Sequence, residues 1–542
     1  MDASLAMTDI RRCLQQLSLF WLCGFIAYLP ALGAFFLADD FHFIHDIAQH
    51  GVQAVWTMFP RNFFRPLVMF SFWMDYSLWN YQSIGFHLTN ILFHATNAFL
   101  IFRITKIWLQ WNQWSIERIN LLAYACAFLF LFHPSHSEAV AWISGRSDVI
   151  ATFWMLASLL TYMYFRESNK YAMLATSWAF FACAALTKES VITFPLLIAA
   201  LEIFRRNGDL RPLKKWPPVL GYFIILAGCF MLRWMMLGNP IGGYGQSIHL
   251  RFDMAFLQRN MIFHTTRTLL PPIGGYNAVI LQYGAYLLYA SAALVLLTIL
   301  NRISRKLSGH ALPTRFELPD WMMAPIILYI ISVLPALNLG IHLGTSLGER
   351  LIYWPSVFTL LLLCCIVDRI LRYQPKITLG TLSVIIVVCA GLLFNANREW
   401  LFAGTYTKKI IQDINKLPSS QRLIVLNIPD TFNGAYMLRN GIQPAVEQNT
   451  DSVLFEDIRS AVFQTIYSET DGVQVKRIDT HTYQVTANGP TTRFLRKGNT
   501  KADQAAFDFI DFQRRQFTVR IKNPRPGDIV AYYNSTNIIP IP

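Results

Sequence analysis

The 542 residues are 54% hydrophobic and only 14% charged, with a mean hydropathy of +0.35, which is too apolar for a soluble globular chain. The net charge of +14 does not indicate nucleic-acid binding, because much of the Lys and Arg flanks apolar segments. All eight cysteines lie in or beside apolar segments, so no disulfide framework is implied. Composition therefore predicts a polytopic α-helical membrane protein.

Apolar runs long enough to cross a bilayer recur from about residue 14 to residue 395. The first follows Arg11 and Arg12, as in a signal peptide, but Leu17 to Leu37 is too long for the apolar region of one. We expect it to be an uncleaved span. Eleven spans are predicted, at 14–37, 84–102, 119–134, 148–165, 171–187, 190–204, 217–237, 283–301, 321–340, 351–368 and 377–395.

Basic residues gather in alternate loops, which predicts the orientation of the spans. With a cytoplasmic N-terminus, the inner loops hold Arg103 and Lys106; Arg166 and Lys170; Arg205, Arg206, Arg211, Lys214 and Lys215; Arg302, Arg305 and Lys306; and Arg369, Arg372 and Lys376. Segment 253–270 is interrupted by Asp253, Arg259 and Arg267, so we expect a helix in the outer interface. The odd number of spans then places everything after about residue 396 on the outer side.

Four polar segments face the outer side on this topology: Asp39–Tyr81, His133–Ser147, Thr187–Glu189 together with loop 238–282, and His342–Arg350. The tail combines a helical pattern at Thr405–Leu417 with strand patterns at Leu423–Ile428, Tyr483–Thr486, Phe517–Ile521 and Ile529–Tyr533. We therefore predict a transmembrane domain, residues 1–398, and a soluble α/β or α+β domain, residues 399–542, on the outer side.

Paired carboxylates, Asp39 and Asp40, follow the first apolar run directly. Such groups accept a proton from an attacking hydroxyl or hold a metal ion. A solvated helix C-terminus is the alternative, although acidic residues suit that end of a helix poorly. With His42, His45 and Asp46 the pair also forms a conceivable metal cluster. Hydrogen bonding of the two histidines within the loop is the favoured interpretation.

A second outer segment runs from His133 through His136 and Glu138 to Arg146 and Asp148, and so places acids, a base and two imidazoles in a short turn. Asp148 also suits the N-cap of the next span. Unpaired charges beside a bilayer are costly, which favours a functional role for the glutamate and the arginine.

Four cations reach the predicted outer face, where they could stabilise a leaving phosphate: Arg65, Arg146, Lys188 and Arg350. Lys188 precedes Glu189 in the chain, and internal ion pairs are the alternative interpretation. The second span carries a polar stripe of His87, Asn90, His94 and Asn97. Such a stripe faces the helix bundle, and interhelical hydrogen bonding is favoured over a direct role in substrate binding.

Several long motifs follow one another in a fixed order between residues 35 and 400. They are Phe64-Arg-Pro-Leu, Ser71-Phe-Trp, Asp75-Tyr, Leu78-Trp, Gly85-Phe-His-Leu-Thr-Asn, the His133 to Asp148 segment, Lys188-Glu-Ser, and Glu349-Arg-Leu-Ile-Tyr-Trp-Pro-Ser. Together they resemble the transmembrane-and-tetratricopeptide-repeat O-mannosyltransferases and their bacterial relatives. The chain lacks the repeat tail of the eukaryotic branch. Its run from Val425 to Gly441 looks like the tails of bacterial relatives, without an assignable role.

The resemblance implies a GT-C fold and an inverting glycosyltransferase of a bacterial inner membrane. The donor would be a hexose or pentose on polyprenyl phosphate, and the acceptor a glycan, lipid or protein at the outer, periplasmic face. Candidate catalytic residues are Asp39, Asp40 and Glu138, and the candidate phosphate-binding residues are Arg65, Arg146, Lys188 and Arg350. Candidate substrate-binding residues are His42, His133, His136, Asp148, Glu189 and Tyr353. A divalent metal, if one is used, would be held by Asp39, Asp40 and His42.

Two other functions fit a polytopic chain of this composition. One is a flippase or transporter of lipid-linked sugars, and the other is a non-catalytic protein of envelope polysaccharide assembly. Transporters place their sites near the midplane of the membrane, often at breaks in helices. Here the charged motifs gather at one face, which favours the enzyme.

Overall fold

The computed structural model describes residues 3–56, 63–205, 216–238, 253–271, 277–308, 317–371, 374–439, 441–448, 454–468, 470–496 and 506–542. Several predicted features lie outside these residues: Arg206, Arg211, Lys214, Lys215, Arg372, residues 57–62 of the first outer loop and parts of loop 238–282.

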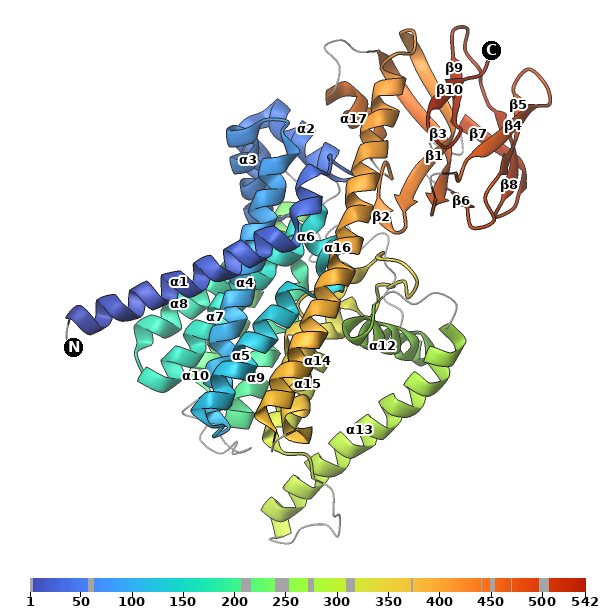
Figure 1. The fold of residues 1–542 in the computed structure, drawn as a ribbon. Helices are drawn as coiled ribbons and strands as arrows, with labels where there is room; N and C mark the ends of the chain where they lie inside the picture. Colours follow the sequence, from blue (N-terminus) through green and yellow to red (C-terminus); the bar gives the residue numbers. More distant parts are fainter. Residues whose placement is uncertain are drawn as a thin grey trace.

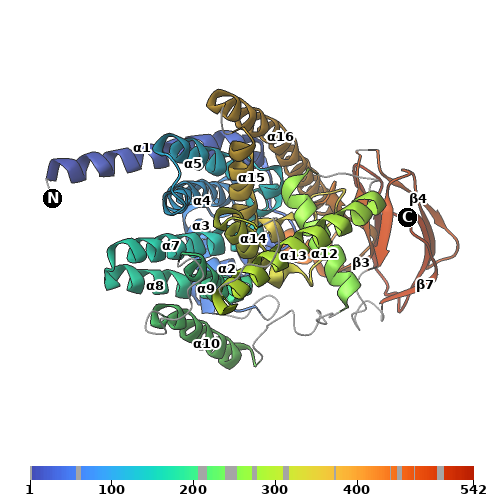
Figure 2. The same cartoon turned by 90° about the horizontal axis from the view of Figure 1, so that it is seen from below.

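The first three quarters of the chain form a helical bundle (Figure 1). Its helices are α1 (Ala3–Ala27), α2 (Asp40–His50), α3 (Pro66–Trp79), α4 (Ser83–Trp111), α5 (Ile116–Leu131), α6 (Ser137–Ala141), α7 (Arg146–Ser168), α8 (Tyr171–Thr187), α9 (Phe194–Arg205), α10 (Pro217–Leu237), α12 (Met254–Leu269), α13 (Asn277–Ser308), α14 (Asp320–Val333), α15 (Ser356–Ile370) and α16 (Pro375–Ile414). Seen from below, α4, α5, α7 and α8 are grouped together, with α10 at the periphery (Figure 2).

Each predicted span contains a helix, but only some of these helices are long and apolar enough to cross a membrane by themselves. Five in the described residues meet that test: Ser83–Trp111, Ile143–Ser168, Pro217–Leu237, Ala278–Arg302 and Pro375–Ile414. The pair Ile116–Leu131 and Pro134–Ala141, bent by 51°, makes a sixth. The chain is therefore a multi-pass helical membrane protein. The predicted count of eleven is too high by this criterion, because helices such as α9, with 12 residues, are short.

The first predicted span was placed wrongly at its C-terminal end. Helix α1 ends at Ala27, and a 3₁₀ turn, η1 (Leu29–Gly33), follows with Pro30 in its first turn. Proline lacks the backbone N–H that continued helix would need, so the apolar run to Leu37 leaves helical structure early. Asp39 and Asp40 therefore do not end the first helix; they begin α2.

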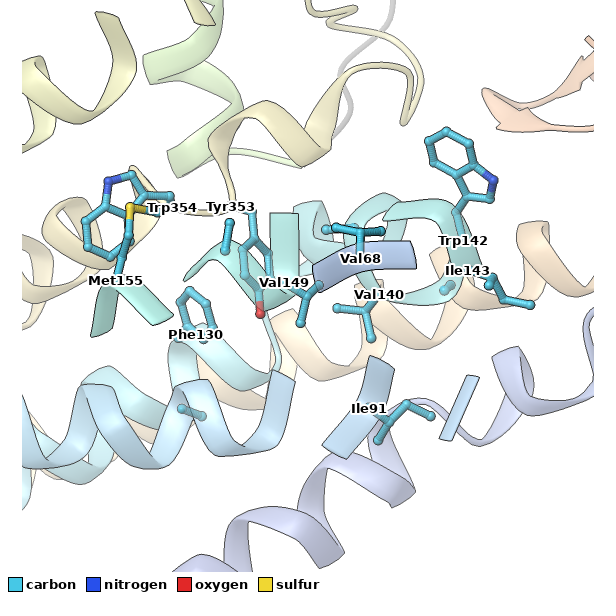
Figure 3. Close-up of a cluster of buried hydrophobic side chains, with 14 of the residues drawn as sticks. Val68, Ile91, Phe130, Val140, Trp142, Ile143, Val149, Met155, Tyr353 and Trp354 are labelled. Carbon is cyan, nitrogen blue, oxygen red and sulfur yellow. The ribbon is translucent and has the colours of Figure 1, made fainter. Parts of the chain in front are cut away.

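Apolar side chains from α3, α4, α5 and α7 pack around the segment that leads into α15. Figure 3 shows Phe130, Tyr353, Trp354 and Met155 gathered in this cluster. Phe130 and Tyr353 meet edge to face at 5.1 Å, a favourable arrangement for two rings. This packing places the 349–356 segment at one end of the bundle.

The polar stripe of α4 binds neighbouring helices, which confirms the interhelical interpretation. His87 contacts the carbonyl of Ala34 at 3.0 Å, and the Asn90 amide donates to the carbonyls of Val140, Trp142 and Ile143. The Asn97 amide donates to the carbonyl of Val149 at 3.0 Å and to the Tyr353 hydroxyl at 3.1 Å. His94 lies 2.7 Å from the same hydroxyl.

The described residues of the tail form two β-sheets and one short helix, α17 (Ile442–Gln448). Sheet one has the order β10-β9-β1-β3-β6, with β2 beside β1, and sheet two the order β4-β5-β8-β7. The strands are β1 (Ser420–Phe432), β2 (Ala435–Tyr436), β3 (Phe455–Ile466), β4 (Val473–Arg477), β5 (Thr482–Ala487), β6 (Arg493–Arg496), β7 (Phe507–Phe512), β8 (Gln516–Ile521), β9 (Ile529–Tyr533) and β10 (Ile538–Pro540). β1 runs parallel to β3 and β9, whereas sheet two is antiparallel.

All four predicted strand segments lie in β1, β5, β8 and β9, so those predictions are confirmed. The predicted helical stretch at Thr405–Leu417 lies in α16 up to Ile414, where the helix ends three residues early; α16 runs unbroken for 40 residues from the last span toward the tail (Figure 1). The predicted domain boundary at residue 398 lies inside this helix. The tail lies on the same side of the bundle as α2 and the 349–352 turn, because α17 packs against α2 and Tyr436 contacts Arg350.

Candidate functional site

The site begins where the chain leaves η1 and enters α2. Ala38 has a positive φ of 48°, and the turn that it makes lets α2 begin at Asp40. Asp39 is the N-cap residue, and its carbonyl accepts hydrogen bonds from the backbone N–H of His42 and Phe43. Acidic residues are favourable at a helix N-terminus, where the helix dipole is positive. The Asp39 side chain is half-buried, whereas Asp40 is 1% exposed.

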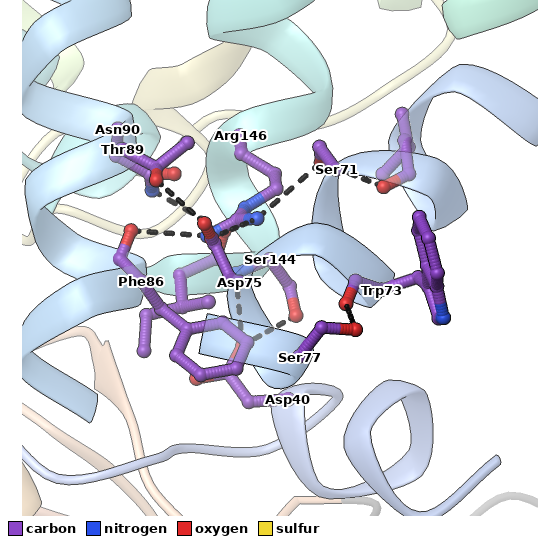
Figure 4. A network of polar contacts seen from close by, with 12 residues as sticks. Asp40, Ser71, Trp73, Asp75, Ser77, Phe86, Thr89, Asn90, Ser144 and Arg146 are labelled. Carbon is purple, nitrogen blue, oxygen red and sulfur yellow. Dashed lines mark hydrogen bonds and ion pairs between the residues drawn. The ribbon is translucent and has the colours of Figure 1, made fainter. Parts of the chain in front are cut away.

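Asp40 is fixed by three hydrogen-bond donors. Its Oδ2 accepts from the backbone N–H of Leu37 at 2.9 Å. Its Oδ1 accepts from the backbone N–H of Ser144 at 2.8 Å and from the Ser144 hydroxyl (Figure 4). Burial raises the pKa of Asp40 to about 7, against the opposing effect of these donors. Asp40 therefore ties the loop to η4 (Ile143–Gly145) of the second outer segment.

Glu138, in α6, pairs with Arg350. The guanidinium donates to Oε1 of Glu138 at 2.7 Å, and the Arg350 backbone N–H donates to Oε2 at 3.0 Å. Arg350 also donates to the Tyr436 hydroxyl at 3.2 Å and lies over the rings of Trp142 and Tyr436. Glu138 is fully buried while the arginine side chain is 27% exposed. One charge of the pair thus remains accessible to a ligand.

A second group of pairs lies around η5 (Glu189–Thr193). Glu189 accepts from Arg65 at 2.7 Å and lies 3.0 Å from Arg233, and Lys188 pairs with Asp148 at 2.5 Å. Burial alone would raise the pKa of Glu189, but the charges of Arg65 and Arg233 outweigh it and lower that pKa. The adjacent positions of Lys188 and Glu189 bring these pairs together.

Arg146 lies deeper than the other three predicted cations. It is wholly buried, pairs with Asp75 at 2.7 Å and donates to the carbonyl of Phe86 at 3.0 Å (Figure 4). Its guanidinium also stacks on the Phe72 ring. The Asp75 carboxylate also accepts from Thr89 at 2.7 Å. These contacts join α3, α4 and α7.

The predicted histidines divide between the bundle and the surface. His133 contacts the carbonyl of Thr268 at 3.0 Å, and His136 lies 2.9 Å from the Ser356 hydroxyl; both are buried. Tyr353 is buried as well, among His94 and Asn97. His42 is half-buried on α2 beside Asp39. In the part of the chain that the structure describes, no three His, Cys, Asp or Glu side chains are placed to hold a metal ion.

Sequence reasoning missed the residues that the tail adds to this face. Tyr436 contacts both Arg350 and the Trp142 ring, at 4.6 Å between ring centroids. Arg439 lies over the same tyrosine and is held by the buried Asp430 at 2.7 and 2.6 Å. All three belong to the 425–441 run, which the sequence marked without a role. Arg233 lies near the end of an apolar helix, where a charge needs a partner. Its position in the sequence could therefore have indicated the ion pair with Glu189.

No family model matches the chain. It is 24% identical over 405 residues to a protein O-mannosyl-transferase of Caenorhabditis elegans, covering 69% of this chain and 54% of that protein. Over 230 residues it is 30% identical to the protein O-mannosyl-transferase Tmtc2 of Drosophila melanogaster, covering 38% and 24%. Over 202 residues it is 29% identical to human TMTC2, covering 33% and 23%. The chain thus spans about half the length of the first of these relatives.

Among solved structures, the chain is similar to ArnT from Cupriavidus metallidurans bound to undecaprenyl phosphate. The TM-score is 0.43 and the sequence identity 11%, with 96% of this chain and 100% of that chain covered. The apo structure of the same protein gives a TM-score of 0.39.

Proposed function

Because the chain is related to the protein O-mannosyl-transferases, we propose that it is an integral-membrane glycosyltransferase with a GT-C architecture. The donor is a sugar on polyprenyl phosphate, and the acceptor is a glycan, lipid or protein. In the proposed topology, the helical bundle crosses a bacterial inner membrane and the N-terminus is cytoplasmic. The face that holds Asp39, Arg350 and the tail is then periplasmic.

One observation carries this proposal: a half-buried carboxylate, Asp39, lies beside a second carboxylate that the fold immobilises. Asp39 is the proposed base. It takes the proton of the acceptor hydroxyl while the hydroxyl oxygen bonds to the anomeric carbon and the bond from that carbon to the phosphate oxygen breaks. Attack opposite the phosphate inverts the anomeric centre. Asp40, buried and hydrogen-bonded, positions the loop without touching the acceptor.

Stabilisation of the departing phosphate is the second part of the proposed mechanism. A carboxylate is a weak base at neutral pH, so positioning and stabilisation of the departing phosphate must supply much of the acceleration. Arg350 and Arg65 are the proposed phosphate-binding residues, because each keeps part of its side chain accessible while its carboxylate partner holds it in place. Lys188 is buried in its pair with Asp148, so we propose it for the phosphate site only through its place beside Glu189. Arg146 is too deeply buried to bind the phosphate, and we assign it the structural role of joining helices through its pair with Asp75.

The test is transfer by the purified protein from a panel of radiolabelled polyprenyl-phosphate hexoses and pentoses. We expect Asp39→Asn to lower kcat by about 10² to 10⁴-fold, the usual contribution of a general base. The matched control is Asp46→Asn, which removes a buried carboxylate from the same helix. Undiminished transfer by the double variant Asp39→Ala, Asp40→Ala would refute the mechanism. Mass spectrometry of envelope glycans with and without the gene then identifies sugar and acceptor.

A further inference from the structure

The backbone just before Asp39 is held by the tail. Ala38 has a φ of 48°, a conformation that residues with a side chain rarely adopt. Its N–H donates to the carbonyl of Met437 at 2.7 Å, a hydrogen bond between residues about 400 positions apart in the chain. A strained conformation persists only where the surrounding structure fixes it. Here that surrounding structure includes the β2 end of the tail.

Gly441 supplies a second contact at the same residue. A Cβ atom at this position would collide with the carbonyl oxygen of Ala38 and would lie 2.9 Å from Cδ2 of Phe41. Only glycine lets the tail backbone approach the loop this closely. The tail therefore contacts both the N–H and the carbonyl of Ala38.

Helix α17, which begins at the next residue, packs against α2. The Gln448 side-chain amide donates to the carbonyl of Phe41 at 2.5 Å, and Glu447 lies 3.7 Å from the ring of His45. These contacts reach the first two turns of the helix that begins with the carboxylate pair (Figure 1).

From these contacts we propose that Met437, Gly441 and α17 form a clamp that sets the position of Asp39 for catalysis. The inference rests on the proposed function. Asp40 anchors the loop to the bundle through Ser144, and the clamp anchors the preceding residue to the tail, so that Asp39 is fixed from both sides. The clamp residues touch no substrate; they are positioning residues. A displacement of a catalytic group by about 1 Å can cost about 100-fold in rate.

The experiment compares Gly441→Ala with Gly472→Ala in the full-length protein. Gly472 is also too crowded for a Cβ atom, but it meets Asn534 inside the tail, away from α2. We expect Gly441→Ala to lower kcat by about tenfold or more, with the KM for the donor within about twofold, because Asp39 moves while the phosphate site stays. Gln448→Ala, a milder change that removes the bond to Phe41, is expected to lower kcat by about threefold, as loss of one hydrogen bond predicts.

Hydrogen–deuterium exchange of the peptide that contains Ala38 gives a second readout, which needs no substrate. Gly441→Ala should speed exchange at this amide and Gly472→Ala should leave it unchanged. The clamp is refuted if Gly441→Ala leaves kcat and exchange at wild-type values, or if Gly472→Ala lowers kcat equally. If the wild type transfers no sugar while Gly441→Ala still speeds the exchange, the proposed function fails and the structural coupling stands.

Discussion

Arg146 and Arg350 both pair with a carboxylate at 2.7 Å, yet they lie in two different environments. The Arg146 pair is closed inside the bundle, where Asp75, a carbonyl and an aromatic ring surround the guanidinium. The Arg350 pair lies at the face that the tail covers, with its cation partly exposed and Tyr436 beside it. The same chemical pair thus joins helices in one place and, in our proposal, presents a charge to a ligand in the other.

The largest expected effect concerns the buried pair. Arg146→Met leaves the Asp75 charge buried without its partner, which typically costs about 3–5 kcal/mol. We expect a large drop in the thermal unfolding midpoint in detergent, measured by intrinsic fluorescence. The double variant Asp75→Asn, Arg146→Met should recover most of it, because no unpaired charge remains. The control is Lys416→Met in the exposed pair with Asp413, which should change little. An unchanged midpoint for Arg146→Met would show that the pair does not hold the helices.

Asp40 lies between the two environments, because it is buried but at the tail-facing side. The pH dependence of the protein's stability measures the free-energy cost of burying this carboxyl. The carboxyl of the unfolded chain has a pKa of about 3.9, whereas burial raises the pKa of Asp40 in the native protein to about 7. Between these values the native state binds more protons than the unfolded state, so stability is lost as the pH rises. The loss amounts to at most about 4 kcal/mol, at about 1.36 kcal/mol for each pH unit.

The check is the unfolding midpoint of the wild type and of Asp40→Asn between pH 4 and pH 8, which covers the range between the unfolded and native values. Asparagine does not titrate, so the wild type should lose stability relative to the variant as the pH rises. Parallel curves would mean that the buried carboxyl stays ionised in the native state.

Much of the fold was readable from local patterns, because helices and strands follow the spacing of apolar residues. β9 coincides with the predicted strand, and the polar stripe of α4 was correctly expected to face other helices. The end of α1 was missed although Pro30 signalled it. Contacts that join distant segments had no local signal in the sequence. Arg65 pairs with Glu189, 124 positions away, and the Ala38 N–H donates to the carbonyl of Met437. For that reason the four cations and the carboxylates Glu138, Asp148 and Glu189 were named from the sequence, but which carboxylate pairs with which cation was not.

A third prediction tests whether the exposed cation binds the donor phosphate. Arg350→Lys keeps the charge beside Glu138 but loses the planar fork that can bind two oxygens at once. We expect the KM for the donor to rise about tenfold, the equivalent of one charged hydrogen bond, with an almost unchanged unfolding midpoint. Steady-state kinetics over a range of donor concentrations measures it. The reverse result, a lower midpoint with a normal KM, would place Arg350 with the structural pairs like Arg146.

The smallest expected effect concerns the contribution of the tail to that cation. Tyr436→Phe removes the hydroxyl that accepts from Arg350 but keeps the ring on which Arg350 and Arg439 lie. Loss of one hydrogen bond at a partly exposed charge corresponds to about 0.5–1.5 kcal/mol, or roughly a two- to tenfold rise in the KM for the donor. Arg350→Lys and Tyr436→Phe each alter one partner of the same hydrogen bond, so their effects on the KM for the donor should not add. Additive effects in the double variant would mean that the tyrosine acts on the donor independently of Arg350.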